Sequence, residues 1–147
     1  MKKILIVLVL GLSLFANDVI VKETTCSVDK TVKNLKDIIR AKNLSIFAIV
    51  NHHGNAKAVD MKLPQAKMIM FGNPKIGTAL MQQDMLVGLD LPIRILVYTD
   101  KDSKVKIAYR DGSWLATKHV LNAATKINKL NNVLDQMTRK AGTCKKD

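Results

Sequence analysis

Aromatic residues are scarce in this chain, where phenylalanine, tryptophan and tyrosine together make up 4% of 147 residues. A surface that stacks nucleic-acid bases needs such side chains, so their scarcity argues against a nucleic-acid partner. The sequence also lacks the nucleotide-binding patterns G-x-x-x-x-G-K-[ST] and G-x-G-x-x-G. The catalytic or redox patterns G-x-S-x-G, H-E-x-x-H and C-x-x-C are missing as well. These absences weigh against an enzyme. The alternative is an enzyme whose catalytic site is assembled from residues far apart in the sequence.

The apolar run at the N-terminus is too short to span a bilayer, which needs about 20 apolar residues. Lys2 and Lys3 precede this run, which extends from Ile4 to Ala16 and ends on a small residue. That order is typical of a secretory signal peptide. We therefore expect residues 1–16 to be removed and the protein to be periplasmic or secreted. An uncleaved leader that anchors the protein in the membrane is the alternative.

Cysteine occurs only twice, as Cys26 and Cys144 near the two ends of the exported chain. In an oxidising compartment the two can pair and tie the termini together. Two inert or metal-binding thiols are the alternative. The length predicts a single domain over residues 17–140. Residues 141–147 are expected to form a flexible basic tail unless Cys144 holds them.

Acidic residues are half as frequent as basic ones, with 12 against 24, which gives a formal net charge of +12. Such a balance favours anionic partners, and we consider an anionic small molecule, an acidic protein and a membrane surface. The alternative is that Lys30, Lys33, Lys36 and Arg40 are simply the solvated face of a helix.

Apolar spacing along the chain predicts alternating strands and helices. Strands are expected at 19–25, 44–50, 67–71, 93–99 and 105–109, the last two as a hairpin. Helices are expected at 28–42, 56–62, 74–82 and 114–140, the first capped by Ser27. This order predicts an α/β (α+β) two-layer sandwich, with helices packed on a mixed sheet of about five strands.

The stretch Phe71-Gly72-Asn73-Pro74-Lys75 combines turn, cap and helix-start residues. Asn73 can cap a helix through its side-chain oxygen, and Pro74 suits the first helical position. The helix start and Lys75 can also attract an anion, which is the second interpretation.

This stretch belongs to a set of motifs by which the chain resembles the bacterial and archaeal family known as domain of unknown function 302. The set continues with Gly77-Thr78, Leu80-Met81, Leu89-Asp90-Leu91-Pro92, Leu96-Val97-Tyr98, Tyr109 and Asp111. The resemblance implies a compact α/β domain with a mixed sheet and a homodimer, and it supplies no activity. It points to His52 and His119. The chain departs from the family pattern at Asn51, at Asp60 where glycine is common, and at Gly112-Ser113 where proline is common.

The residues and the resemblance together define the candidate site. Its ligand-binding candidates are His52, Asn73, Lys75, Asp90, Tyr109 and His119. We expect an exported, non-catalytic small-ligand-binding or interaction module with a pocket near His52, Asn73 and His119. The alternative is metal (copper) or haem handling, through His52 and His119 or through Met68, Met70, Met81 and Met85. The cofactor is left unassigned, and a structural role is the alternative for each histidine and methionine.

Overall fold

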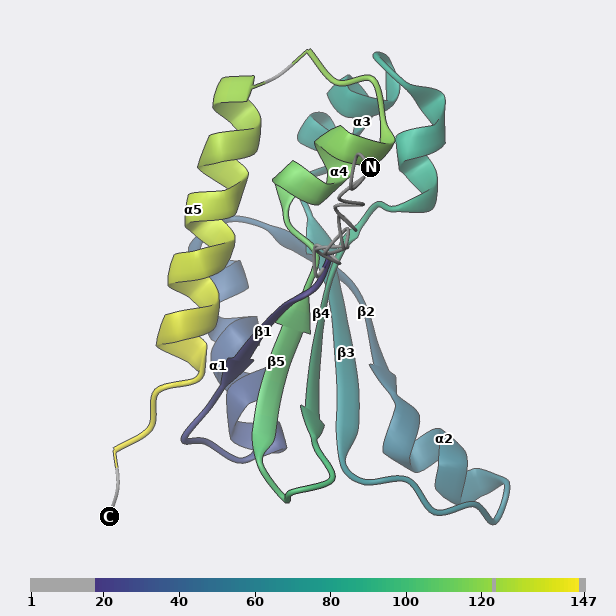
Figure 1. The fold of residues 1–147 in the computed structure, drawn as a ribbon, viewed down its shortest axis with the longest axis vertical. Helices are drawn as coiled ribbons and strands as arrows, with labels where there is room; N and C mark the ends of the chain where they lie inside the picture. Colours follow the sequence, from purple (N-terminus) through teal and green to yellow (C-terminus); the bar gives the residue numbers. More distant parts are fainter. Residues whose placement is uncertain (1–17, 123, 146–147) are drawn as a thin grey trace, which may run out of the picture.

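The computed structural model describes residues 18–122 and 124–145, so the expected signal peptide at residues 1–16 lies outside the described residues. One sheet contains β1 (Ile20–Glu23), β2 (Ser45–Asn51), β3 (Ala66–Gly72), β4 (Ile93–Thr99) and β5 (Val105–Tyr109), in the order β1-β5-β4-β3-β2 (Figure 1). The predicted α/β class with helices packed on a five-stranded sheet is confirmed. Its pairings are all antiparallel, where a mixed sheet was expected. β1 and β2 run in the same direction, but they lie at opposite edges because a helix connects them across one face.

That helix is α1 (Val28–Ala41), which lies behind the sheet in Figure 1 and packs beside the long helix α5 (Ala124–Ala141). The upper end of the sheet holds α3 (Pro74–Met81), the 3-10 helix η1 (Met85–Leu89) and α4 (Gly112–Lys118). α2 (His52–Ala58) projects from the lower end. Within the described ranges, no helix is long and apolar enough to cross a membrane.

The core lies between the sheet and the pair α1 and α5. Strand residues that face these helices alternate with residues on the other face, as expected for a sheet with one covered side. The covered side contains buried side chains from three central strands, namely Ile69, Phe71, Ile93, Ile95, Val97, Ile107 and Tyr109. α1 contributes Val28, Val32, Leu35 and Ile39, and α5 contributes Leu134, Met137 and Ala141.

The opposite face of the sheet is an open face that α1 and α5 do not cover. A row of apolar side chains crosses all five strands there, because the register aligns Val21, Ala108, Leu96, Met68 and Val50. Val21 is 47% exposed and the other four are not fully buried. The open face therefore presents apolar surface next to the helices at the upper end.

The helix predicted at 114–140 is divided into α4 and α5, which corrects that prediction. His119 adopts extended backbone angles after α4, with φ −132° and ψ 151°. In the link, the Val120 N–H donates to Asp84 Oδ2 and the Asn122 N–H donates to Gln83 Oε1. These bonds hold the link against the segment between α3 and η1. The short helix expected at 56–62 instead begins at His52 and ends at Ala58.

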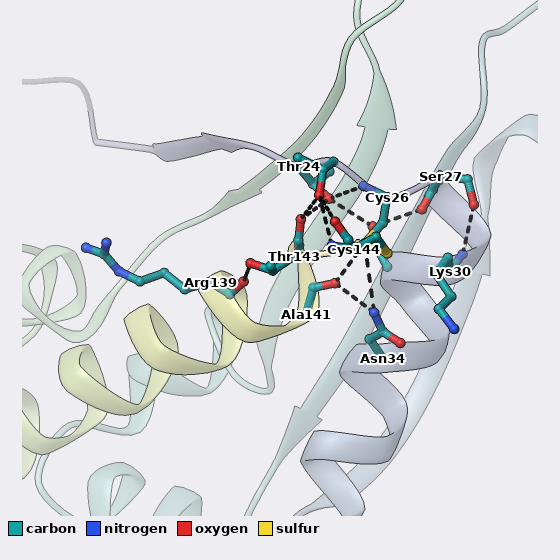
Figure 2. The surroundings of a disulfide bond; sticks show 12 residues. Thr24, Cys26, Ser27, Lys30, Asn34, Arg139, Ala141, Thr143 and Cys144 are labelled. Atoms are coloured by element: carbon teal, nitrogen blue, oxygen red, sulfur yellow. Dashed lines mark hydrogen bonds between the residues drawn. A yellow bond between two sulfur atoms is a disulfide. The ribbon is translucent and has the colours of Figure 1, made fainter. Parts of the chain in front are cut away.

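The C-terminal segment is held, and Cys144 forms a disulfide with Cys26 (Figure 2). The Thr24 hydroxyl donates to the Gly142 carbonyl at 2.7 Å, and the Cys144 N–H donates to Thr25 Oγ1 at 2.8 Å. The last helix continues to Ala141, one residue beyond the expected boundary. The described part of the expected tail is therefore held against the residues that follow β1, as expected if Cys144 holds it.

Candidate functional site

A buried histidine links two aspartates at the upper end of the sheet. His119 Nε2 lies 2.7 Å from Asp90 Oδ2, and its Nδ1 lies 3.4 Å from Asp84 Oδ2. Only 7% of the histidine side chain is exposed. Backbone N–H groups of Leu86 and Val120 donate to Asp84, and together with His119 they lower the pKa of that carboxyl. The cluster joins the end of α4 to η1, so its first role is structural.

The two histidines of the predicted site lie at opposite ends of the sheet, which corrects the predicted common pocket. His52 is the first residue of α2 at the lower end, whereas His119 follows α4 at the upper end (Figure 1). A single metal or haem site shared by these two residues does not fit this arrangement. Across the described residues, no group of three or more His, Cys, Asp or Glu side chains is placed to hold a metal ion.

The motif around His52 mainly organises α2. Asn51 caps the helix, since its Oδ1 accepts the N–H of Gly54 at 2.9 Å. The Nδ1 of His53 lies 2.6 Å from the carbonyl oxygen of Leu63 and connects α2 to the following loop. An aspartate at position 51 could accept the same capping bond. The departure at Asn51 therefore leaves the local structure intact.

Asn73 caps α3 as the sequence predicts. Its Oδ1 accepts the N–H groups of Lys75 at 2.9 Å and Ile76 at 3.4 Å, and Pro74 stands in the first turn. The N–H groups that an anion needs at a helix start are thus already bonded. The geometry favours the structural interpretation of the Asn73-Pro74-Lys75 stretch.

The methionines of the copper alternative have different surroundings. Met68 and Met70 lie on the open face of β3. Met81 packs against the core, while Met85 is 69% exposed. This distribution favours packing over one copper site.

A hollow of about 290 Å³ lies where the open face meets α4. Met68, Leu96 and Ala108 line it from three adjacent strands, and Trp114 lines it from α4. Charged residues also line it, namely Asp90, Arg94 and Arg110. Val19, Ile93, Tyr109 and Leu115 complete the lining. The hollow thus combines apolar strand residues with three charged groups, one of which belongs to the His119 cluster.

The two arginines are held in place without carboxylate partners among the described residues. Arg94 Nη2 donates to the Leu89 carbonyl at 2.7 Å, and the Arg110 guanidinium lies 4.7 Å from the centre of the Trp114 ring. Such stacking orients a guanidinium while leaving its N–H donors available. Asp90 lines the same hollow, and its Oδ2 contacts His119. The lining therefore contains two arginines and one carboxylate.

Arg94, Arg110 and Trp114 were not among the predicted site residues. Arg94 lies between Ile93 and Ile95, which are buried, so alternation along the strand places it on the uncovered side and indicates nothing more. The available signal was the hairpin register. Ile95 and Tyr109 form the last pair of the β4–β5 ladder, so Arg94 and Arg110 are the residues just beyond it on the two strands. Both arginines therefore lie at the same end of the hairpin, beside the hollow.

Tyr109 belongs mainly to the core, where it is 4% exposed. Lys22 Nζ lies 5.5 Å from its ring centre and donates to Asp135 Oδ1 at 2.7 Å. Hydrogen bonds from Arg139 and then Lys22 lower the pKa of Asp135 to about 2. These contacts connect β1 to α5. A second hollow beside them is lined by groups already paired, including Lys22 and Arg139, so its role is structural.

The structure accounts for two departures from the family pattern. Asp60 has φ 57°, a left-handed conformation that glycine adopts without strain. The Gly112 N–H donates to Asn131 Oδ1 at 2.8 Å, a bond that proline cannot make. A Cβ atom at Gly112 would lie 2.9 Å from the same oxygen. Glycine at 112 thus fits the contact between α4 and α5.

The fold and hollow define a two-layer α/β domain with an open antiparallel face. Residues 20–137 match the model of the family described as domain of unknown function DUF302, and the chain belongs to that family. A solved structure of an uncharacterised conserved DUF302 protein from Bacillus stearothermophilus has the same fold. That similarity has a TM-score of 0.62 and 12% identity, and it covers 86% of this chain and 94% of the other.

Curated relatives share more sequence but are much longer. Proteins named fluoride-specific ion channel FluC 1 from Brucella suis and Brucella abortus are each 34% identical over 115 residues, or 78% of this chain. The match covers 45% and 43% of these relatives. The chain therefore spans less than half the length of the curated relatives it matches.

Proposed function

We propose that this protein is an exported, non-catalytic module that binds a small organic anion in the hollow between α4 and the open face. The central observation is the pair Arg94 and Arg110, which line the hollow with no carboxylate partner among the described residues. A guanidinium has five N–H donors, and Arg94 uses only part of this capacity on Leu89. A carboxylate can accept two parallel bonds from such a group.

The apolar lining indicates what else the ligand contains. Met68, Leu96 and Ala108 offer a surface for an aliphatic or aromatic body, and Trp114 supplies a flat wall. A volume of about 290 Å³ is near the lower end for ligand sites and suits a small molecule. Among ligand classes, a monocarboxylate with a short apolar body combines the required charge and shape.

Two further observations support the proposal, one for the export and one for the ligand. The disulfide between Cys26 and Cys144 supports export, because such bonds persist in oxidising compartments. An anionic ligand also agrees with the name of the Brucella relatives, since fluoride is an anion. Fluoride is accordingly one of the probes in the test.

The decisive experiment follows the fluorescence of Trp114, which is the only tryptophan in the chain and lines the hollow. Benzoate, hexanoate and fluoride are titrated into the protein, with benzamide as the uncharged counterpart of benzoate. We expect saturable changes with the carboxylates and none with benzamide. Calorimetry then measures affinity in Arg94→Gln and Arg110→Gln, where losing a charged hydrogen bond weakens binding at least about tenfold.

Arg40→Gln is the matched control, because Arg40 is an exposed arginine on the last turn of α1, away from the hollow. It should leave binding unchanged. The proposal is overturned if no carboxylate binds at millimolar concentration, or if the Arg40 variant weakens binding as much as the other two. If fluoride binds and the carboxylates do not, the ligand of this site is an inorganic anion and not an organic one.

A further inference from the structure

An exposed apolar segment projects from the opposite end of the molecule. We call residues 57–63, which end α2 and begin the following loop, the α2 tip. Val59 is 64% exposed, Met61 is 66% exposed and Leu63 is 42% exposed. Figure 1 shows α2 and this loop at the lower end, away from the packed pair α1 and α5. These three side chains do not contribute to the hydrophobic core.

The backbone of the α2 tip is fixed by local hydrogen bonds. The Met61 N–H donates to the Ala56 carbonyl at 2.9 Å and the Asp60 N–H donates to the Lys57 carbonyl at 3.1 Å. With the positive φ of Asp60, this is a Schellman end of a helix. Because the segment is already ordered, its apolar side chains lose little backbone freedom on meeting a partner.

Positive charge accompanies this apolar surface. Lys57 and Lys62 are exposed and alternate with the apolar residues, and Asp60 is the only acidic residue of the α2 tip. Lysines beside exposed apolar side chains match the layered chemistry of an anionic bilayer, with headgroup charge outside and hydrocarbon beneath. An acidic protein offers the negative charge, but it also needs an apolar pocket that matches the shape of these side chains.

From this complementarity we propose that the α2 tip docks the protein on anionic lipid membranes. Val59, Met61 and Leu63 enter the boundary between headgroups and acyl chains, and Lys57 and Lys62 remain among the anionic headgroups. The attraction of the lysines falls with ionic strength, whereas the apolar contribution does not. This docking is separate from anion binding in the hollow, and either can fail without the other.

The first test places a reporter at the α2 tip. Met61→Trp is prepared in a Trp114→Phe background and mixed with vesicles of phosphatidylglycerol and phosphatidylcholine containing brominated lipid. We expect a blue shift and quenching of the emission. Met85→Trp in the same background is the matched control, because Met85 is 69% exposed but lies in η1 at the upper end. It should show neither change.

The second test measures affinity by cosedimentation with the same vesicles and with phosphatidylcholine alone. Val59→Ser/Met61→Ser should bind the anionic vesicles roughly a hundredfold more weakly, about tenfold for each apolar side chain removed. Met85→Ser/Leu89→Ser should bind like the unmodified protein, since it removes two apolar side chains that are 69% and 75% exposed at the other end.

Three results would overturn the proposal. They are equal quenching at positions 61 and 85, unchanged affinity of the Val59/Met61 variant, and equal binding to vesicles with and without phosphatidylglycerol. Sedimentation velocity without lipid adds one more outcome. A change of oligomeric state in the Val59/Met61 variant, with vesicle affinity unchanged, would assign the α2 tip to a protein contact instead.

Discussion

Breaking the disulfide between Cys26 and Cys144 should remove a large part of the stability of this domain. The bond joins residues separated by 118 positions. In the chain-entropy model, closing a loop of this length destabilises the unfolded state by about 5 kcal/mol. The free energy of unfolding of a single domain is typically roughly 5–15 kcal/mol, so the contribution of the disulfide is comparable to the total stability. The hydrogen bonds between the C-terminal segment and Thr24 and Thr25 belong to the folded state, so they do not alter this entropy of the unfolded state.

Urea unfolding of Cys26→Ser/Cys144→Ser against the oxidised protein measures the effect. We expect the free energy of unfolding to fall by about 3–5 kcal/mol and the m-value to rise, because the unfolded chain expands. Reductant should reproduce the loss in the unmodified protein and change nothing in the double variant. A loss below about 1 kcal/mol in a two-state transition would refute the entropic reasoning. Two free thiols in the native protein would refute the pairing itself.

Three further predictions test local features of the fold. His119→Ala removes the bridge between Asp84 and Asp90 and should lower the free energy of unfolding in urea by about 2–3 kcal/mol. His53→Ala is the control, because its ring is more exposed, and should lower it by less than half as much. Equal losses in the two variants would contradict the structural role of the cluster. Asp60→Gly should stabilise by about 1 kcal/mol, because it relieves a left-handed conformation, and a lower melting temperature would contradict this. The pKa of Asp135 is lowered from 3.8 to about 2 by Arg139 and Lys22, so its stabilising contribution is complete above about pH 4 and is lost as the pH falls toward 2. In Asp135→Asn the free energy of unfolding should therefore fall less steeply as the pH is lowered from 4 toward 2. The same pH dependence in the variant and the unmodified protein would show that the ion pairs of Asp135 contribute nothing.

Features set by near neighbours in the chain were predictable from the sequence. The cap at Ser27 accepts the Lys30 N–H, and the cap at Asn73 accepts that of Lys75, in both cases across two or three residues. Alternation in the hairpin placed Val105, Ile107 and Tyr109 on one side of a strand. Such signals depend on local geometry, and they were enough to define the five strands and the fold class.

The division of the last predicted helix was not predictable in this way. Apolar spacing continues across the link, but the link is held by bonds to residues far away in sequence. Val120 contacts Asp84 at a separation of 36 residues, and Asn122 contacts Gln83 at a separation of 39. His119 reaches Asp90 across 29 residues. Tertiary hydrogen bonds thus overrode a local preference for helix.

The candidate site shows why a prediction from residue types differed from one based on geometry. His52 and His119 were predicted because the family resemblance points to them and histidines bind ligands, yet they lie at opposite ends of the sheet. Neither Arg94 nor Arg110 was among the predicted site residues. The two arginines lie just beyond the last pair of the β4–β5 hairpin, and both line the hollow beside α4. Two arginines that line one hollow without a carboxylate partner among the described residues are therefore stronger evidence for a binding site than either histidine.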